Sequence, residues 1–244
     1  MRLTYPSLLS GCCGRASEAG GWPGYHRWVN ATTTPPVTAA DVDLAVGLVA
    51  DALNGALDRD WQVPAGDLEW DCRETVEHMA DDLFAYAGQL GPRRPPRDTH
   101  VPFAWQRSRA NGPALTIYAD AGASNAGLVQ VLEACGTFLS SLVTTVPPDT
   151  RAFHIFGLGD PEGFAAMGVV EVLVHMRDVA AGLGIDWTPP EDLCDRVLYR
   201  LFPEAPTGTP RWETLLWATG RGEVDGRARL GEWRWQAAPR RGVT

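Results

Sequence analysis

A glutamate and a histidine at helical spacing, Glu171 and His175, form the pair in this sequence best suited to chemistry. On an α-helix, residues i and i+4 lie on one face about one turn apart, where a carboxylate and an imidazole can bind one divalent cation. A third ligand must come from another segment, and His78 is the candidate. Two histidines and a glutamate with an open fourth position are typical of catalytic zinc sites. The residues therefore predict a metal site, although such a pair is also common as a hydrogen-bonded surface pair.

Two other polar residues bear on this hypothesis. Asp178 lies one turn beyond His175, and it is interpreted either as an acceptor or cavity group beside the imidazole or as the ion-pair partner of an arginine. His154 is interpreted as a structural loop histidine in preference to a ligand. The rest of the segment around Glu171 is almost wholly apolar, so its polar stripe lies in a helix expected to be buried. Buried charged groups need partners, and a metal is one such partner.

The position of His78 on its predicted helix argues against its role as a metal ligand. The apolar residues of its segment recur along a different helical face, and His78 lies beside Asp82, where water could solvate it. Cys72 offers a rival chemistry, because the helix dipole would favour its thiolate. However, no cysteine–histidine spacing supports a catalytic dyad, and the sequence contains no Gly-x-Ser-x-Gly elbow, glycine-rich phosphate loop or paired-cysteine zinc motif.

The composition excludes several classes of protein. The chain has 244 residues and a formal net charge of −9, without a basic run dense enough for a nucleic-acid surface. All 21 basic residues are arginine, which excludes a Schiff-base or Walker-type lysine. No apolar run approaches the length of a membrane span. Because the 5 cysteines have no regular spacing, we expect no disulfide framework and a cytoplasmic protein. The acidic surface fits either a monomer or a homodimer.

Hydrophobic periodicity predicts four long helices after an irregular leader over residues 1–37. These helices are expected over 38–57, 71–90, 124–145 and from 160 to a stop at Gly182 or Gly184. A long connection, strand-like at 114–118, separates the second helix from the third. The pattern predicts a mainly α fold, a bundle of four helices with one crossover, over residues 38–185.

A small C-terminal extension is expected over residues 186–244. Pro189-Pro190 opens a helix to about Leu201, and a second helix is expected over 212–219. Residues 228–237 alternate between apolar and polar types, with Trp233 and Trp235 on one face, which predicts a half-buried strand. The extension is therefore predicted to be α+β.

Three segments resemble the family of DinB-like, mycothiol-dependent maleylpyruvate isomerases. Residues 70–80, WDCRETVEHMA, are similar to the family's second-helix signature, and residues 163–178, GFAAMGVVEVLVHMRD, to its fourth-helix motif. LLWATGR at 215–221, followed by a tryptophan-rich segment, is similar to its C-terminal extension. The resemblance covers residues 38–237 and leaves out the leader.

The resemblance implies an up-down-down-up four-helix bundle that binds a divalent metal, usually zinc, through His78, Glu171 and His175. The open coordination position would receive the thiol of mycothiol, whose thiolate form the metal favours. The thiolate would add to a small-molecule electrophile; in an isomerase it leaves again, and in a transferase it stays attached. Arg221 resembles a family arginine near the active site and could pair a substrate carboxylate, or it could be a cation at the end of a helix.

Three functions remain open from the sequence. The leading hypothesis is a metal-dependent isomerase or S-transferase that uses a low-molecular-weight thiol, with Asp178 and Arg221 as candidate catalytic residues. The second is a non-catalytic metal- or ligand-binding module, whose site would be closed by a fourth protein ligand such as His154 or Asp178. The third is a hydrolase that activates a metal-bound water.

Overall fold

Six helices and one short strand pair make up the regular structure of residues 34–240, the part of the chain that the computed structural model describes. The helices are α1 (Ala39–Asn54), α2 (Cys72–Leu90), α3 (Asn125–Thr145), α4 (Pro161–Leu183), α5 (Glu191–Leu201) and α6 (Arg211–Ala218). The strands are β1 (Gln106–Arg107) and β2 (Ala114–Leu115), which pair antiparallel. The fold is mainly α, as predicted. Residues 1–33 of the expected leader lie outside the described residues.

The four long helices begin where the sequence places their caps. Thr38 precedes α1, and the side chains of Asp71, Ser124 and Asp160 accept hydrogen bonds from backbone N–H groups in the first turns of α2, α3 and α4, at 2.7 to 3.2 Å. Gly184 ends α4 with a φ of 65°, a left-handed conformation that glycine adopts freely. These local contacts fix the starting points of α2 and α4, the two helices that carry the candidate ligands.

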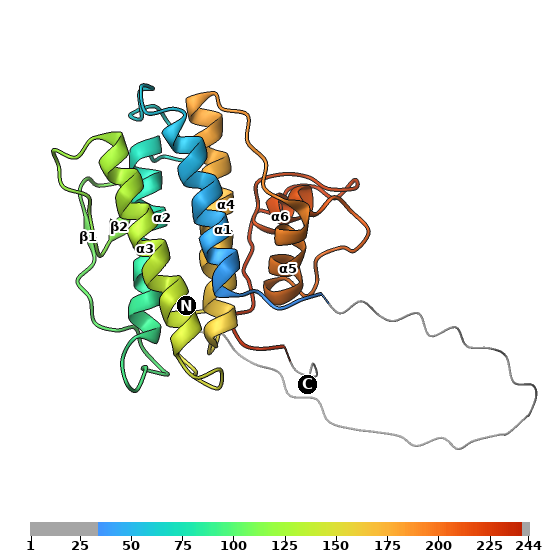
Figure 1. The fold of residues 1–244 in the computed structure, drawn as a ribbon. Helices are drawn as coiled ribbons and strands as arrows, with labels where there is room; N and C mark the ends of the chain where they lie inside the picture. Colours follow the sequence, from blue (N-terminus) through green and yellow to red (C-terminus); the bar gives the residue numbers. More distant parts are fainter. Residues whose placement is uncertain (1–33, 241–244) are drawn as a thin grey trace, which may run out of the picture. The chain divides into compact units, whose positions relative to one another are not determined.

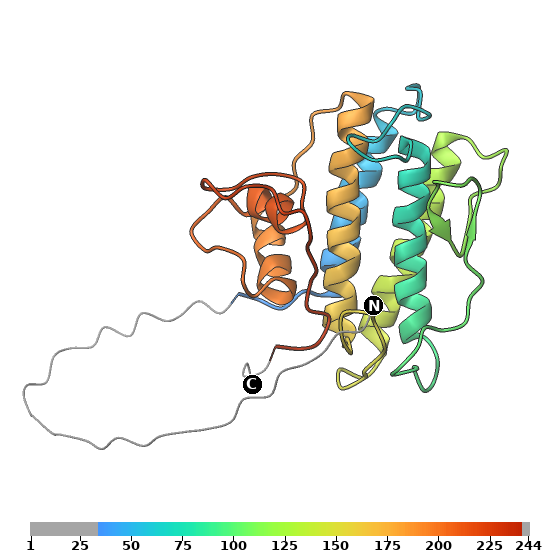
Figure 2. The same ribbon diagram turned by 180° about the vertical axis from the view of Figure 1, so that it is seen from behind.

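The four long helices lie side by side (Figures 1 and 2). α1 and α4 run in one direction and α2 and α3 in the other, because the connection over residues 91–124 returns the chain to the end of the group where α2 begins. The core lies between these helices. Its largest fully buried side chains include Leu53, Met79, Leu83, Leu128, Leu132, Leu139, Phe164, Met167, Leu173 and Met176.

The connection between α2 and α3 contains less strand than the predicted 114–118. β2 pairs only with β1, and the next two N–H groups, of Thr116 and Ile117, donate to Oδ1 of Asp81 at 2.7 and 2.9 Å. The carboxylate takes the place of a partner strand at these positions. The connection is therefore tied directly to α2.

The prediction of an α+β extension is wrong. α5 and α6 form where expected, but residues 228–237 form no strand, because no other strand lies beside them in the described chain. The N–H of Gln236 donates instead to the last carbonyl of α5, at 2.8 Å. The two tryptophans expected on one buried face differ, since Trp235 is buried while Trp233 is 37% exposed.

The extension is joined to the long helices by a buried arginine. Nη2 of Arg200 on α5 donates to Oδ1 of Asp160, the cap of α4, at 2.7 Å. The same nitrogen donates to the carbonyl of Ala237 at 3.0 Å. One guanidinium thus connects α5, the start of α4 and the C-terminal segment.

Among the described residues, one helix meets the length and composition of a membrane span, which the sequence analysis does not expect. α3 has 21 residues and a mean hydropathy of 1.5 over its most apolar window. Leu128, Leu132 and Leu139 on this helix are fully buried. A core helix has the same composition, so this finding by itself is weak support for a span.

Candidate metal centre

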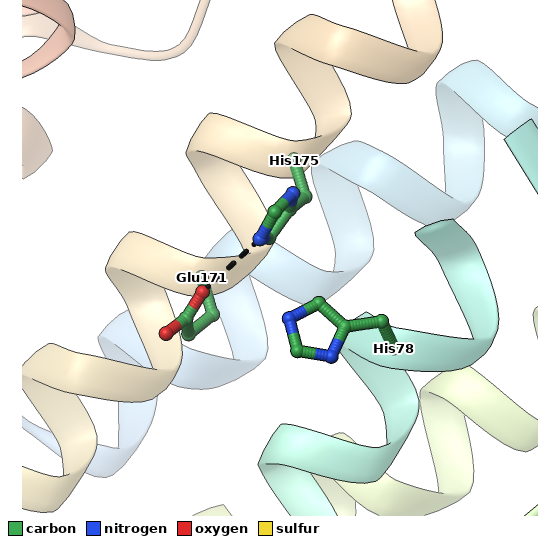
Figure 3. A group of neighbouring side chains, drawn as sticks. All are labelled: His78, Glu171 and His175. Carbon is green, nitrogen blue, oxygen red and sulfur yellow. Dashed lines mark ion pairs between the residues drawn. The ribbon is translucent and has the colours of Figure 1, made fainter. Parts of the chain in front are cut away.

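Three side chains predicted to form a metal site meet between α2 and α4 (Figure 3). His78 comes from α2, and Glu171 and His175 come from successive turns of α4. One possible ligand atom from each residue lies within 4.8 Å of the other two. The imidazole centroids are 4.9 Å apart, and Nε2 of His175 lies 3.3 Å from Oε2 of Glu171. Two imidazole nitrogens and a carboxylate oxygen suit Zn²⁺, so this triad could hold a metal ion.

His78 does not point into bulk water, although its helical face argued for solvation. Its side chain is only 19% exposed. The ring packs edge-on against the indole of Trp70, at 4.8 Å between centroids, and against the ring of His175. α2 contacts both α3 and α4, so it buries more than one face, and His78 lies on the face toward α4.

The environment of His78 keeps its imidazole neutral. Burial, with a smaller contribution from the nearby charge of His175, lowers its pKa to about 3. Nδ1 is buried without a hydrogen-bond partner among the described residues, and Nε2 lies 3.2 Å from Oδ2 of Asp82. A neutral imidazole has a lone pair available for a metal at any pH well above this value.

Two carboxylates favour the protonated form of His175. Burial lowers its pKa, but hydrogen bonds to Asp178 and Glu171 outweigh burial and raise the pKa above 6.5. Nδ1 lies 3.5 Å from Oδ2 of Asp178. Burial likewise raises the pKa of Glu171, but the hydrogen bond with His175 and the charges of His175, His78 and Arg221 together lower the pKa below its usual value. A metal bound here would take the place of the proton on His175.

Asp178 is both an acceptor beside the imidazole of His175 and the ion-pair partner of an arginine, the two roles that the sequence left open. One of its oxygens faces His175, and the same oxygen accepts a hydrogen bond from Nε of Arg221 at 3.0 Å and lies 2.9 Å from Nη2 of that arginine. Arg177 lies 3.3 Å from the other oxygen. Arg221 also donates to the carbonyl of Thr219 at 3.2 Å, and its Nη2 lies 3.4 Å from Nδ1 of His175. The structure therefore brings both candidate catalytic residues to the imidazole of His175.

A cavity of ≈ 380 Å³ lies beside the triad, with His78 and Glu171 in its wall. Its other lining residues are Asp82, Ala85, Tyr86, Gln89, His100, Trp105, Phe153, His154, Ile155, Phe156, Phe164 and Trp235. Pockets for small ligands usually measure about 300–1,000 Å³. The cavity thus gives a small molecule room next to two of the candidate ligands.

The sequence analysis misses two residues of this site, Asp82 and Tyr86. Burial and the charge of Glu171 raise the pKa of Asp82 well above its usual value. The hydroxyl of Tyr86 donates to Oε1 of Glu171 at 3.4 Å. Both follow His78 at successive turns of α2, which is the signal that could have found them. The sequence analysis instead counts Asp82 as a sign of solvent.

His154 and Cys72 take no part in the triad. Nδ1 of His154 accepts a hydrogen bond from the N–H of Phe156 at 3.1 Å within its own loop, and its side chain lines the cavity. Burial lowers the pKa of His154 to about 4. The hypothesis of a reactive thiolate at Cys72 is wrong, because its side chain is fully buried and burial raises its pKa to about 11.

Comparison of this sequence and structure with known proteins identifies no relative. No family model, curated protein or solved structure matches this chain.

Proposed function

We propose that this chain is a metal-dependent enzyme of the DinB-like, mycothiol-dependent maleylpyruvate isomerase class. Its four long helices would be the up-down-down-up bundle of that class. It would act in the cytoplasm as an isomerase or S-transferase, with a low-molecular-weight thiol, mycothiol, and a small electrophilic substrate. The observation that carries the proposal is the meeting of His78 with Glu171 and His175 beside a cavity of ≈ 380 Å³.

Three features support Zn²⁺ at this triad. The donor set of two imidazoles and one carboxylate is one that zinc favours. His78 is neutral, so its contact with Asp82 at 3.2 Å is not a pair of opposite charges, and the lone pair of the ring is available to a metal. Asp178 faces the ring nitrogen of His175 on the side away from Glu171, as second carboxylates commonly do at metal sites. When bound, the ion would supply a positive charge that favours the thiolate form of a thiol.

The surrounding side chains position the ligands. Arg221 fixes Asp178, and Asp178 in turn fixes the ring of His175. Tyr86 donates to Glu171 from the cavity side and restricts the carboxylate to one orientation. In this arrangement Asp178 and Arg221 act through His175, as positioning residues.

The cavity favours an enzyme over a closed binding module. A closed structural site needs a fourth protein ligand. His154 is hydrogen-bonded within its own loop, and Asp178 is paired with Arg221, so both candidates for that role are engaged elsewhere. The fourth position would then face the cavity, where a thiol or a substrate could reach it.

Metal analysis combined with a thiol-conjugation assay tests the proposal. We expect one zinc per chain in the wild type, loss of zinc in His175→Ala, and retention in Asp192→Asn, a control variant at a carboxylate that is 74% exposed and does not line the cavity. We also expect conjugation of mycothiol to a generic electrophile by the wild type and not by His175→Ala. Zinc retained by His175→Ala would contradict the ligand set. Zinc binding without thiol turnover would favour the binding module, and hydrolysis without thiol would favour the hydrolase.

A further inference from the structure

A second cavity, of ≈ 520 Å³, lies in the C-terminal extension at the C-terminal ends of α5 and α6, the two short helices in Figure 1. Its volume falls in the range of about 300–1,000 Å³ that is usual for pockets of small ligands. None of His78, Glu171 and His175 lines this cavity. The candidate metal centre therefore does not account for it.

Trp233, in the wall of the second cavity, is held in place although it is 37% exposed. A Cβ added at Gly220 would lie 2.8 Å from Cδ1 of Trp233, so the ring lies directly against the backbone of this glycine. Gly220 has a φ of 67°, so the backbone also favours glycine there. The ring of Trp235 packs on Trp233 with 5.7 Å between centroids. Trp233 thus has a defined position while part of its surface stays uncovered.

Other apolar side chains add to this uncovered surface. Ile155 is 64% exposed and Phe156 is 36% exposed, and both line the second cavity. Trp217 contributes another indole to the wall, and its N–H already donates to the carbonyl of Ala228 at 3.1 Å. Aromatic walls favour stacked or edge-to-face contacts with the ring of a ligand.

The size of this surface favours a small molecule over a protein partner. A stable protein interface involves about 20–30 residues on each side. The exposed apolar side chains described above are Ile155, Phe156 and Trp233, and all of them lie in the wall of one cavity. A single ring system can cover them.

The polar side chains of the wall are exposed, so they lie at the edge of the second cavity. They are Glu204, Arg234 and Gln236. Within residues 34–240, none of these side chains has a hydrogen-bond or ion-pair partner. One is acidic, one is basic and one is neutral, so the cavity does not select its ligand by net charge. Rings in the wall and polar groups at the edge suit a ligand that is apolar at one end and polar at the other.

The second cavity adjoins the cavity beside the triad, because Ile155, Phe156 and Trp235 line both. The metal-ligand candidates contribute only to the cavity beside the triad. A molecule held in the second cavity therefore contacts the shared wall and not the triad.

We infer that the second cavity is a separate binding site for a flat aromatic molecule that carries a polar group at one end. The ring lies among Phe156, Trp217 and Trp233, and the polar group lies toward Arg234 and the other polar side chains at the edge. This site goes beyond the proposed function, since it requires neither the metal nor a reaction.

Binding of 2-naphthol to the full chain tests the inference. This probe is neutral near pH 7, so the charge of a bound ion or of a side chain does not decide the result. Isothermal titration calorimetry should give a Kd below about 1 mM, with the same value for the zinc-loaded and the metal-free protein. Weaker binding would overturn the inference. Binding that changes about tenfold or more with zinc would place the probe at the triad and would also overturn it.

A saturated probe tests whether the ligand is aromatic. Decahydro-2-naphthol has the carbon skeleton and the hydroxyl of 2-naphthol without the flat π-system. We expect it to bind at least about threefold more weakly, because it cannot stack on the indoles. Equal or tighter binding of the saturated probe would contradict an aromatic ligand.

Variants of the two cavities locate the probe. Trp233→Ala should weaken 2-naphthol binding by about threefold or more. Trp105→Ala is the matched control, because it removes an exposed tryptophan that lines only the cavity beside the triad, and it should leave binding unchanged. Ala205→Phe, at a half-buried lining position, should weaken binding by filling the second cavity while keeping its rings.

The melting temperature of each variant checks that it folds, and Ala205→Phe tests the site independently of Trp233. Equal effects of the Trp105 and Trp233 substitutions would place the probe outside the second cavity and overturn the inference. Unchanged binding in folded Ala205→Phe would overturn it as well.

Discussion

At the scale of single residues, each ring nitrogen of His175 faces a carboxylate. Glu171 faces one ring nitrogen at 3.3 Å and Asp178 faces the other at 3.5 Å, while Arg221 fixes Asp178. His78 has no comparable pair of partners, and its pKa falls to about 3. The two imidazoles therefore have pKa values shifted in opposite directions, so the protonation of His175 controls how metal binding depends on pH.

Removing the charge of Asp178 should weaken zinc binding. Asp178→Asn keeps the size of the side chain but weakens the acceptor that orients His175. Loss of such a partner typically lowers metal affinity by about 10- to 100-fold. Competition with a chromophoric chelator measures the change. Asp192→Asn, at a carboxylate that is 74% exposed, is the matched control, and equal affinities for the two variants would contradict the positioning role.

Zinc affinity should fall as the pH decreases toward 6, because His175 must lose its proton before it can ligate. Its pKa is raised above 6.5, so the protonated ring stabilises the metal-free fold below 6.5, and this contribution is lost as the pH rises through the raised pKa. Affinity should drop by about tenfold per pH unit below that pKa. His78, with a pKa of about 3, adds no proton release in this range.

Calorimetry in buffers of different ionisation enthalpy measures the protons released on zinc binding. We expect about one proton per zinc near pH 6, and a smaller zinc-induced rise in melting temperature at pH 6 than at pH 8. Zinc binding without proton release at pH 6 would show that His175 is not a ligand.

The sequence contains enough information to name the three metal-ligand candidates, and the reason is their spacing. Glu171 and His175 share a helical face by geometry alone, and His78 is the histidine near the middle of another long helix. Asp82 and Tyr86 require knowledge of which face of α2 meets α4. Periodicity marks the most apolar face of a helix and gives no sign of a second buried face that carries polar groups.

At the scale of elements, α4 passes close to the segment that precedes α2. A Cβ added at Gly182 would lie 2.6 Å from Sγ of Cys72 and would also clash with the carbonyl oxygen of Pro64. Glycine at this position therefore allows α4 to approach the beginning of α2. This close approach helps to bring the helix of His175 next to the helix of His78.

Gly182→Ala should destabilise the fold, whereas Gly47→Ala should stabilise it. Nothing lies within 4 Å of a Cβ at Gly47, which is in the interior of α1, so alanine there gains about 0.5–1 kcal/mol of helix stability. At Gly182 the clash involves backbone, and overpacking typically costs about 1–3 kcal/mol. Urea unfolding of both variants measures the difference. Similar stabilities for the two variants would contradict the close approach.

Helix starts could be predicted from the sequence because caps are local. Asp71 and Asp160 lie directly before their helices and bond to residues in the first turn. The strand over 228–237 could not be predicted reliably, because a strand exists only with a partner. Period-two alternation describes which side chains are buried and does not say what the backbone bonds to.

At the scale of the whole molecule, Arg200 holds the C-terminal extension to the long helices. Arg200→Met removes one member of a buried pair and leaves the carboxylate of Asp160 without its arginine. We expect a loss of about 3–5 kcal/mol in the free energy of unfolding. Arg229→Met is the control, because its pair with Asp67 is exposed and worth about 0–1 kcal/mol. Equal losses in denaturant unfolding would contradict the role of Arg200.

The cavity beside the triad is a property of the whole molecule and could not be predicted from the sequence. Tyr86, Trp105, His154 and Trp235 come from four separate segments of the chain. Neither periodicity nor local spacing places such segments beside one another. The sequence could indicate the metal-ligand candidates but not the aromatic side chains that lie next to them.

The most direct measurement of the central claim is anomalous diffraction at the zinc edge from crystals of the zinc-loaded protein. We expect one strong peak between α2 and α4, bonded to His78, Glu171 and His175, with zinc–nitrogen distances of about 2.0–2.1 Å. A map without a peak between these helices, or a zinc bound to Glu171 and His175 with His78 turned away, would contradict the account.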